Sequence, residues 1–214
     1  MGNKITNSLG IELPEYIEGY GKIKPFMGAF YYYNKENQNT HSRRIRNHKP
    51  NNKKLCSSIR EAIEKSGLKD GMTISFHHHL RNGDGVIMLV VEEISKMGIK
   101  DISICTSSFT NAHEGLIDYI KSGVITSIAT SGLRGEIGKA VSTDNILKKP
   151  VVFRTHGGRA RAIEAGEVKI DVAFIGAPAC DEEGNMNGSE GKSAFGAMGY
   201  PMIDALYANH VIAI

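Results

Sequence analysis

From about residue 53, apolar residues at helical spacing alternate with short apolar runs. Leu55, Ile59 and Ile63 recur at helical spacing, and Gly67 follows as a helix stop. The next apolar run, 72–76, comes after a Lys-Asp-Gly turn and is typical of a β-strand. The alternation then continues, with helices expected at 84–98, 114–121, 136–141 and 160–165 and strands at 102–105, 124–129, 151–153 and 172–175.

This alternation predicts an α/β fold with an open, mainly parallel sheet flanked by helices. Parallel strands need crossover connections, and the expected helices have the right length to supply them. In such sheets ligands bind at the carboxyl ends of the strands. The loops of interest therefore follow residues 76, 105, 129, 153 and 175. The last segment, 208–214, is interpreted as a strand interrupted mid-domain.

Residues 1–52 lack the alternation and predict an irregular N-terminal arm, ahead of an α/β domain at 53–214. The tyrosine run 31–33 in this arm suits a strand or a docking surface. Residues 1–54 carry a net charge of +6, against +3 for the whole chain, so the basic segment 43–49 suits contact with nucleic acid or an acidic partner. No nucleic-acid-binding motif accompanies that charge, and a solvated arm with no nucleic-acid partner is preferred.

Composition and motifs exclude several other classes of protein. The longest apolar stretch, 86–91, falls far short of the ~18 residues of a membrane span, so no membrane association is expected. Cys56, Cys105 and Cys180 are too far apart for a disulfide framework or a zinc knuckle, and they fit a reduced, cytoplasmic protein. Because no P-loop, GxGxxG or GxSxG motif is present, nucleotide hydrolysis, NAD chemistry and serine-hydrolase chemistry are not expected.

The loop after the first expected strand carries His77, His78, His79 and Arg81 among glycines. Hydrogen-bond donors and a positive charge beside a helix N-terminus suit an anion or a developing oxyanion. A zinc site is the rival interpretation. Adjacent residues of an extended chain point to opposite sides, so three consecutive histidines cannot all face one metal. No metal site is therefore predicted, and histidines hydrogen-bonded for purely structural reasons remain an alternative.

Three later strand-end loops repeat this chemistry. Hydroxyl groups follow the second strand, where capping the next helix is the alternative role. Glycine and arginine follow both the third and fourth strands, and the guanidinium fork matches carboxylate geometry. Because these loops meet at one sheet edge, they predict a site for a di- or tricarboxylate. The residues concerned are Ser107, Ser108, Arg134, Gly157, Gly158 and Arg159.

The same stretches resemble the α subunits of citrate lyase, from about residue 53 to the end. The matching segments are 65–79, which ends in His-His-His, then 130–135, 155–159, 170–176 and 180–185. More distantly, the strand–glycine-loop–helix units resemble the coenzyme A transferase superfamily. The resemblance implies a coenzyme A transferase-like, sugar-phosphate-isomerase-like scaffold. The family's chain is about twice as long, so the sequence is interpreted as lacking a second α/β half and any catalytic glutamate that lies there.

The resemblance also implies an activity. The α subunit of the family transfers the acyl-carrier thioester from acetate to citrate, and a β subunit then cleaves the citryl-carrier product. The thioester belongs to a coenzyme A-like prosthetic group on the acyl-carrier (γ) subunit, so the chain is expected to bind no cofactor of its own. The expected partners are the β and γ subunits, citrate, acetate and acetyl-coenzyme A or acetyl-carrier, and a homo-oligomer is expected.

Under this interpretation, the candidate residues in the strand-end loops have separate roles. His78 and His79 are the predicted catalytic residues, polarising the substrate. The predicted substrate-binding residues are Arg81, Ser107, Ser108, Arg134, Gly157, Gly158 and Arg159. Two alternatives stay open: a coenzyme A transferase for another carboxylic acid, and a non-catalytic ligand-binding or assembly module.

Overall fold

The computed structural model of the chain describes residues 2–27, 54–78 and 82–214. Several sequence-based predictions fall outside these described residues. They concern the tyrosine run 31–33, the basic segment 43–49, His79 and Arg81. Within the described part of the chain, no helix is both long and apolar enough to cross a membrane.

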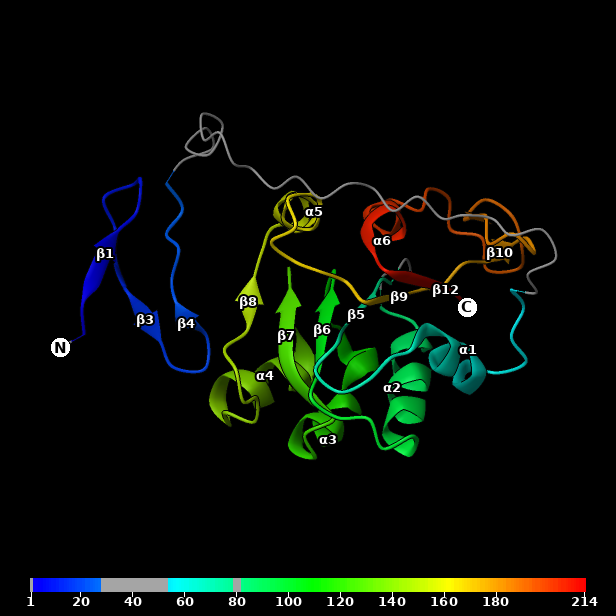
Figure 1. Ribbon diagram of the computed structural model, residues 1–214, viewed down its shortest axis with the longest axis horizontal. Coiled ribbons are helices and arrows are strands. Elements are labelled where there is room, and N and C mark those ends of the chain that lie inside the picture. The colour runs from blue at the N-terminus through cyan, green and yellow to red at the C-terminus, as the bar shows by residue number, and fades with distance from the viewer. Residues whose placement is uncertain (1, 28–53, 79–81) are drawn as a thin grey trace.

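The body is built on a six-stranded sheet in the order β12-β9-β5-β6-β7-β8, with every neighbouring pair parallel (Figure 1). The predicted α/β fold with a parallel sheet is therefore confirmed. The strands span β5 Thr73–Phe76, β6 Ile102–Thr106, β7 Ile125–Thr130, β8 Val152–Phe153, β9 Val172–Ile175 and β12 His210–Ala213.

The described residues contain six helices, of which α1 precedes β5 and the other five connect successive strands of the sheet. They span α1 Ile59–Ser66, α2 Val86–Lys96, α3 Leu116–Lys121, α4 Gly135–Thr143, α5 His156–Glu164 and α6 Pro201–Tyr207. A short 3₁₀ turn, η1 Asn111–His113, precedes α3. The predicted stop of the first helix is confirmed, because Gly67 ends α1 in the left-handed conformation that glycine adopts without strain.

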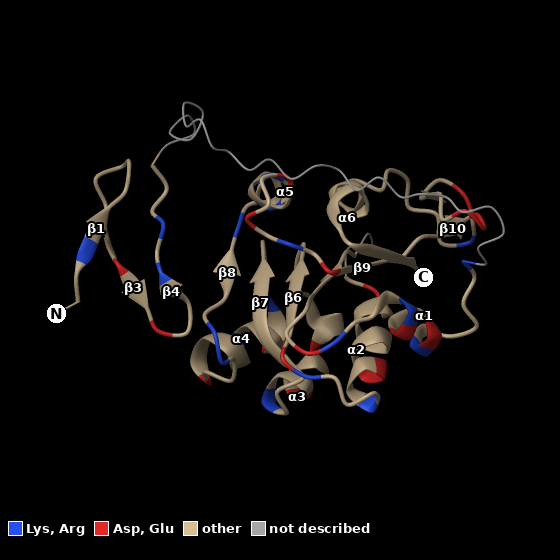
Figure 2. Cartoon of the chain, in the orientation of Figure 1, with Lys and Arg blue, Asp and Glu red and all other residues tan. Residues whose placement is uncertain are grey.

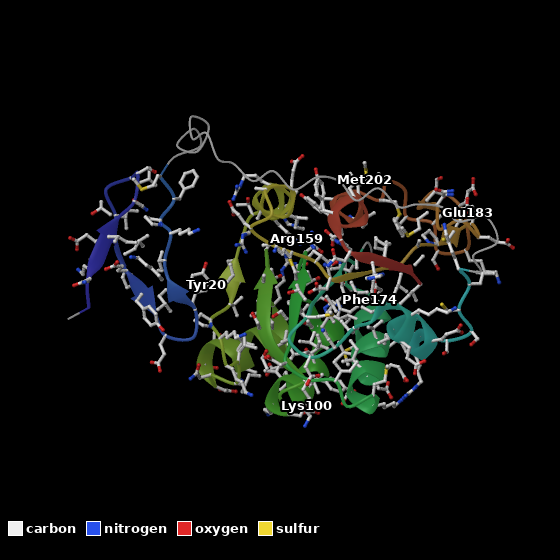
Figure 3. The ribbon with its side chains drawn as sticks, in the orientation of Figure 1. Tyr20, Lys100, Arg159, Phe174, Glu183 and Met202 are labelled. Atoms are coloured by element: carbon white, nitrogen blue, oxygen red, sulfur yellow. The ribbon has the colours of Figure 1, made fainter. Side chains whose placement is uncertain are left out.

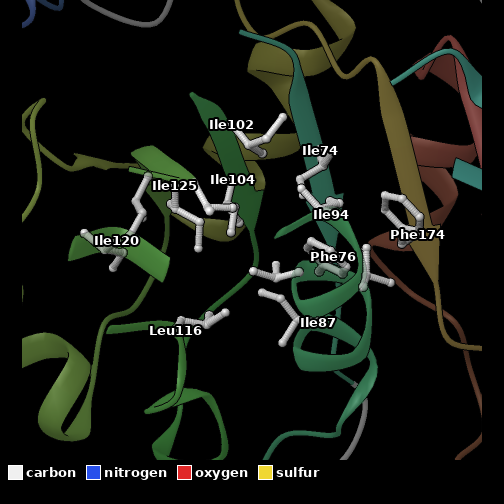
Figure 4. Close-up of a cluster of buried hydrophobic side chains, with 14 of the residues drawn as sticks. Ile74, Phe76, Ile87, Ile94, Ile102, Ile104, Leu116, Ile120, Ile125 and Phe174 are labelled. Atoms are coloured by element: carbon white, nitrogen blue, oxygen red, sulfur yellow. The ribbon is translucent and has the colours of Figure 1, made fainter. Parts of the chain in front are cut away.

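Successive side chains of each strand point to opposite faces of the sheet, and both faces are buried. Ile74 and Phe76 of β5 belong to the larger apolar cluster, which also takes in residues of α1 to α4 (Figure 4). Ala173 and Ile175 of β9 belong to a smaller cluster with Ile163 of α5 and residues of α6. Helices α1–α4 therefore cover one face and α5 and α6 the other.

The chain changes direction once across this sheet. From β5 the strands progress through β6 and β7 to β8, and the chain then returns to place β9 on the other side of β5. In doubly wound sheets ligands bind at the carboxyl ends of the strands beside such a reversal. The reversal lies between β5 and β9, next to the histidine-rich segment that follows β5. On the side of β5 opposite to β9, strands β6 and β7 carry no charged residues (Figure 2).

Three details differ from the sequence-based predictions. The N-terminal segment is not irregular where it is described, because it contains two antiparallel hairpins, β1 Lys4–Thr6 with β2 Glu12–Pro14 and β3 Tyr16–Ile17 with β4 Gly21–Lys22. The loop after β9 contains a third small hairpin, β10 Ala179–Cys180 with β11 Met186–Asn187. Helix α6, which the sequence pattern did not predict, follows that hairpin.

Candidate functional site

His78 and Ser108 meet at the carboxyl edge of the sheet. The His78 Nε2 atom lies 2.5 Å from the Ser108 Oγ atom, which joins the loops after β5 and β6. The ring of His113, on η1, lies 6.2 Å from the His78 ring between centroids. His113 is buried, and its Nδ1 accepts a hydrogen bond from the Thr110 backbone N–H. The structure therefore brings together one predicted catalytic residue and one predicted substrate-binding residue.

The loops after β6 and β7 are joined through Ser131. Its backbone N–H donates to the Ser107 carbonyl at 3.1 Å, and its hydroxyl donates to the same oxygen. The Ser131 Oγ also lies 3.3 Å from the Nε2 of His156, at the start of α5. The His156 ring stacks on Tyr200 with a centroid distance of 4.9 Å. Ser107 thus contributes its carbonyl to a network that runs across the strand ends to α5.

Arg134 borders an open hollow of about 500 Å³ together with Asn82, Thr110, Asn111 and Ala112. A small polycarboxylate fits a pocket of this size. Arg134 is exposed and immediately precedes α4, where first-turn backbone N–H groups also favour an anion. The hollow therefore combines a guanidinium, amide and hydroxyl groups and a helix N-terminus.

Gly157 and Gly158 do not lie in a loop, as the sequence predicted, but in the first turn of α5. Thr155 caps this helix, because its hydroxyl accepts the Gly158 N–H at 3.0 Å. That N–H is thereby occupied. Gly157 is exposed, and an added Cβ would meet nothing within 4 Å, so a ligand has room to approach its backbone.

Arg159 differs most from its prediction. It lies between α5 and the ends of the central strands and is only 3% exposed (Figure 3). Its two terminal nitrogens contact the Asp204 carboxylate of α6 at 2.9 and 2.8 Å. His77 Nε2 lies 2.6 Å from the same carboxylate. This arrangement therefore does not provide a direct contact between Arg159 and citrate, because the guanidinium is already bound to the buried carboxylate of Asp204.

Burial and ion pairing control the charge states near the strand ends. Burial alone would raise the pKa of Asp204, but hydrogen bonds from His77 and Arg159 lower it to about 2. Asp204 is therefore a carboxylate at neutral pH and accepts a hydrogen bond from His77. Burial lowers the pKa of His113, and the adjacent His78 lowers it further. Burial raises the pKa of the Cys105 thiol, which disfavours the thiolate that a cysteine nucleophile needs.

Sequence reasoning missed Asp204, His113 and a site role for His156. His113 follows the hydroxyl-rich segment after β6, and His156 lies within the segment 155–159, both of which the sequence pattern did single out. Asp204 had no such signal, because it lies 45 residues from Arg159 and on an unpredicted helix. Within the described ranges, no group of three or more His, Cys, Asp or Glu side chains is arranged to hold a metal ion.

Comparisons with known proteins settle the family. The family model described as citrate lyase, alpha subunit (CitF), matches residues 52–214. The chain belongs to the citrate lyase α-subunit family. The resemblance noted from the sequence is thereby confirmed. The matched region contains every predicted site residue and leaves out the two N-terminal hairpins of the described segment.

Relatives in the citrate lyase α-subunit family are close in sequence and structure. The Haemophilus influenzae citrate lyase alpha chain is 48% identical over 76% of this chain and 32% of the relative. The Escherichia coli alpha chain is 44% identical over 83% of this chain and 34% of the relative. A Streptococcus mutans structure described as an α subunit of citrate lyase in complex with citrate has a TM-score of 0.84 and 51% identity, covering 97% of this chain and 39% of that one. The chain thus spans about a third of the length of its curated relatives.

Proposed function

We propose that this chain carries part of the acyl-carrier transferase site of citrate lyase, which converts acetyl-carrier and citrate into citryl-carrier and acetate. One observation carries the proposal. In a chain of this family, the contact between His78 and Ser108 and the hollow beside Arg134 lie on neighbouring loops at the carboxyl edge of the sheet. Basic and hydroxyl groups gathered there suit a polycarboxylate substrate.

The overall exchange makes and breaks one thioester. A citrate carboxylate takes the place of acetate on the carrier sulfur. The acetyl C–S bond and one citryl C–O bond break, a citryl C–S bond and an acetyl C–O bond form, and acetate leaves with the oxygen that citrate gave up. Attack at a thioester carbonyl develops negative charge on oxygen beside an already anionic substrate. Donors that meet this oxyanion are worth about 2.7–4 kcal/mol each in the transition state.

The described residues divide this work. His78, held by Ser108, is the group we assign to the developing oxyanion. Arg134, at the hollow, is assigned to a citrate carboxylate. Gly157 offers an open backbone to the substrate. His79 and Arg81 keep their proposed roles from the sequence, in catalysis and carboxylate binding.

The reaction also requires partners. The thioester is proposed to be that of a coenzyme A-like prosthetic group on the acyl-carrier (γ) subunit, with a β subunit cleaving citryl-carrier. The chain itself is proposed to bind no cofactor, to act in the cytoplasm and to form a homo-oligomer. The rings of His156 and Tyr200 are exposed and stack on each other beside the strand ends. We expect the prosthetic group of the carrier to approach the sheet edge over these rings.

The test is acetate release from acetyl-carrier, or from acetyl-coenzyme A as its substitute, by the intact subunit. The expected result is release that depends on citrate. Tricarballylate and succinate serve as comparison acids. Turnover with a different acid and not with citrate would assign the protein to another transferase activity, and binding of citrate without any turnover would favour a ligand-binding module.

A further inference from the structure

A buried ionic cluster ties together three elements beneath the proposed site. Asp204 of α6 is fully buried, with His77 and Arg159 only 4% and 3% exposed. The carboxylate contacts both terminal nitrogens of Arg159, from α5, and the Nε2 of His77, at the end of β5. The cluster therefore fixes α5 and α6 against the carboxyl end of β5.

Arg159 extends this connection to the next strand. Its Nη2 atom also donates to the backbone carbonyl of Cys105, in β6, at 3.3 Å. His77 immediately precedes His78, and Cys105 lies three residues before Ser108. The pair of Arg159 and Asp204 therefore contacts the ends of both β5 and β6. The loop after β5 carries His78 and the loop after β6 carries Ser108, the two partners of the contact at the proposed site.

Stability alone does not explain such a cluster. Replacing a buried ion pair by apolar residues of similar volume is often neutral or stabilising, because desolvation offsets the attraction between the charges. The surrounding sheet face is otherwise lined by small or apolar residues such as Ala173, Ile175 and Ile163. In addition, His77 Nδ1 and Arg159 Nε are buried without hydrogen-bond partners among the described residues, and each such atom costs about 1–3 kcal/mol.

We propose that Asp204, Arg159 and His77 form a positioning unit for the transferase site, holding the ends of β5 and β6 so that His78 and Ser108 keep their geometry. None of the three touches substrate in this role. The inference rests on the proposed function. Since a misplacement of about 1 Å at a reacting group can lower the rate about 100-fold, loss of the unit is expected to lower kcat more than it raises the KM for citrate.

The experiment measures citrate-dependent transfer and thermal unfolding on variants of the intact subunit. Asp204→Asn removes the charge and keeps the size of the side chain. The double variant Arg159→Met/Asp204→Leu replaces the whole pair by apolar groups and keeps the protein folded if the single variant does not. The matched control is Arg161→Met/Glu167→Leu, which removes an exposed bidentate pair whose arginine lies on the same helix.

We expect the first two variants to lose about 10–100-fold in kcat, with the KM for citrate within about threefold of wild type, while the control keeps wild-type kinetics. A folded Arg159→Met/Asp204→Leu protein with wild-type kcat would overturn the proposal, because packing alone would then suffice. An equal loss in the control would overturn it as well.

His77 separates positioning from direct chemistry. His77→Gln retains a donor that can reach Asp204, whereas His77→Leu does not, so the glutamine variant should keep most of the kcat that leucine loses. Equal loss in both would overturn the positioning role, since it would make the His77 Nδ1 atom itself essential. The NMR signals of the His78 ring, recorded on the same variants, report its geometry without turnover. They therefore test the unit even if wild type shows no citrate-dependent transfer, a result that would reject the proposed function alone.

Discussion

Removing the carboxylate of Asp204 should be among the most destabilising single changes in the described structure. The change leaves the Arg159 guanidinium buried without its counter-charge and removes the partner of the His77 Nε2 atom. Breaking a buried pair in this way costs about 3–5 kcal/mol of unfolding free energy. A second route to the magnitude uses the pKa of Asp204, which falls from 3.8 to about 2 on folding. That shift corresponds to about 2 kcal/mol, a smaller value because it counts only the preference for the ionised carboxyl group.

The assay is urea denaturation of Asp204→Ala in the intact subunit, with Asp118→Ala as the matched control. Asp118 is an exposed aspartate on α3, where substitution should change the free energy of unfolding by no more than about 0.5 kcal/mol. A loss of unfolding free energy below about 1 kcal/mol at Asp204 would contradict this expectation, since the ion cluster would then contribute little beyond packing.

The contribution of Asp204 to the free energy of unfolding should also depend on pH. Because the pKa of Asp204 is lower in the folded state than in the unfolded state, its carboxylate stabilises the fold above pH 3.8, and this contribution disappears as the pH falls towards about 2. Wild type should therefore lose more unfolding free energy than Asp204→Ala between these two pH values. Parallel curves for the two proteins would contradict the assignment.

Three further predictions concern the strand-end site. His78→Ala should lower kcat by about 100-fold or more with citrate binding retained, as measured by single-turnover transfer; an unchanged kcat would remove His78 from the oxyanion role. Arg134→Gln should raise the KM for citrate about tenfold or more, the KM for acetyl-coenzyme A serving as control, and equal changes in both would argue against a citrate contact. Gly83→Ala should destabilise the fold by at least about 1 kcal/mol more than Gly67→Ala in thermal melts. Both glycines have left-handed φ angles, +89° and +68°, but an added Cβ collides with the buried side chains of Thr110 and His113 only at the first.

Much of the fold was predictable because its signals are local. The strands β5, β6, β7 and β9 are short apolar runs between glycine-rich turns, and all four appear within one or two residues of their predicted positions. The start of α5 was not predicted, because Gly157 and Gly158 are poor helix formers and mask the Thr155 cap. Helix α6 has only seven residues and no side-chain cap at Tyr200, so its start signal is weak and consists of Pro201 at the first helical position.

The site was only partly predictable for a different reason. Loops after adjacent parallel strands must meet at one sheet edge, so the neighbouring positions of the loops that carry His78 and Ser108 follow from the order of β5 and β6. The contact between the two side chains depends on the conformation of these loops and was not predicted. The partner of Arg159 depends instead on how two helices pack on the opposite face. An arginine after two glycines reads as exposed, whereas packing buries it on Asp204, a contact between residues with no neighbouring sequence signal.

The exchange of acetate for citrate on the carrier is tested most directly by following radiolabel from citrate into the carrier thioester with the intact subunit. We expect label in a thioester that hydroxylamine cleaves, with one acetate released for each citryl group formed. Acetate release without label in the thioester would contradict this exchange, because the site would then hydrolyse the acetyl group and not exchange it for citrate.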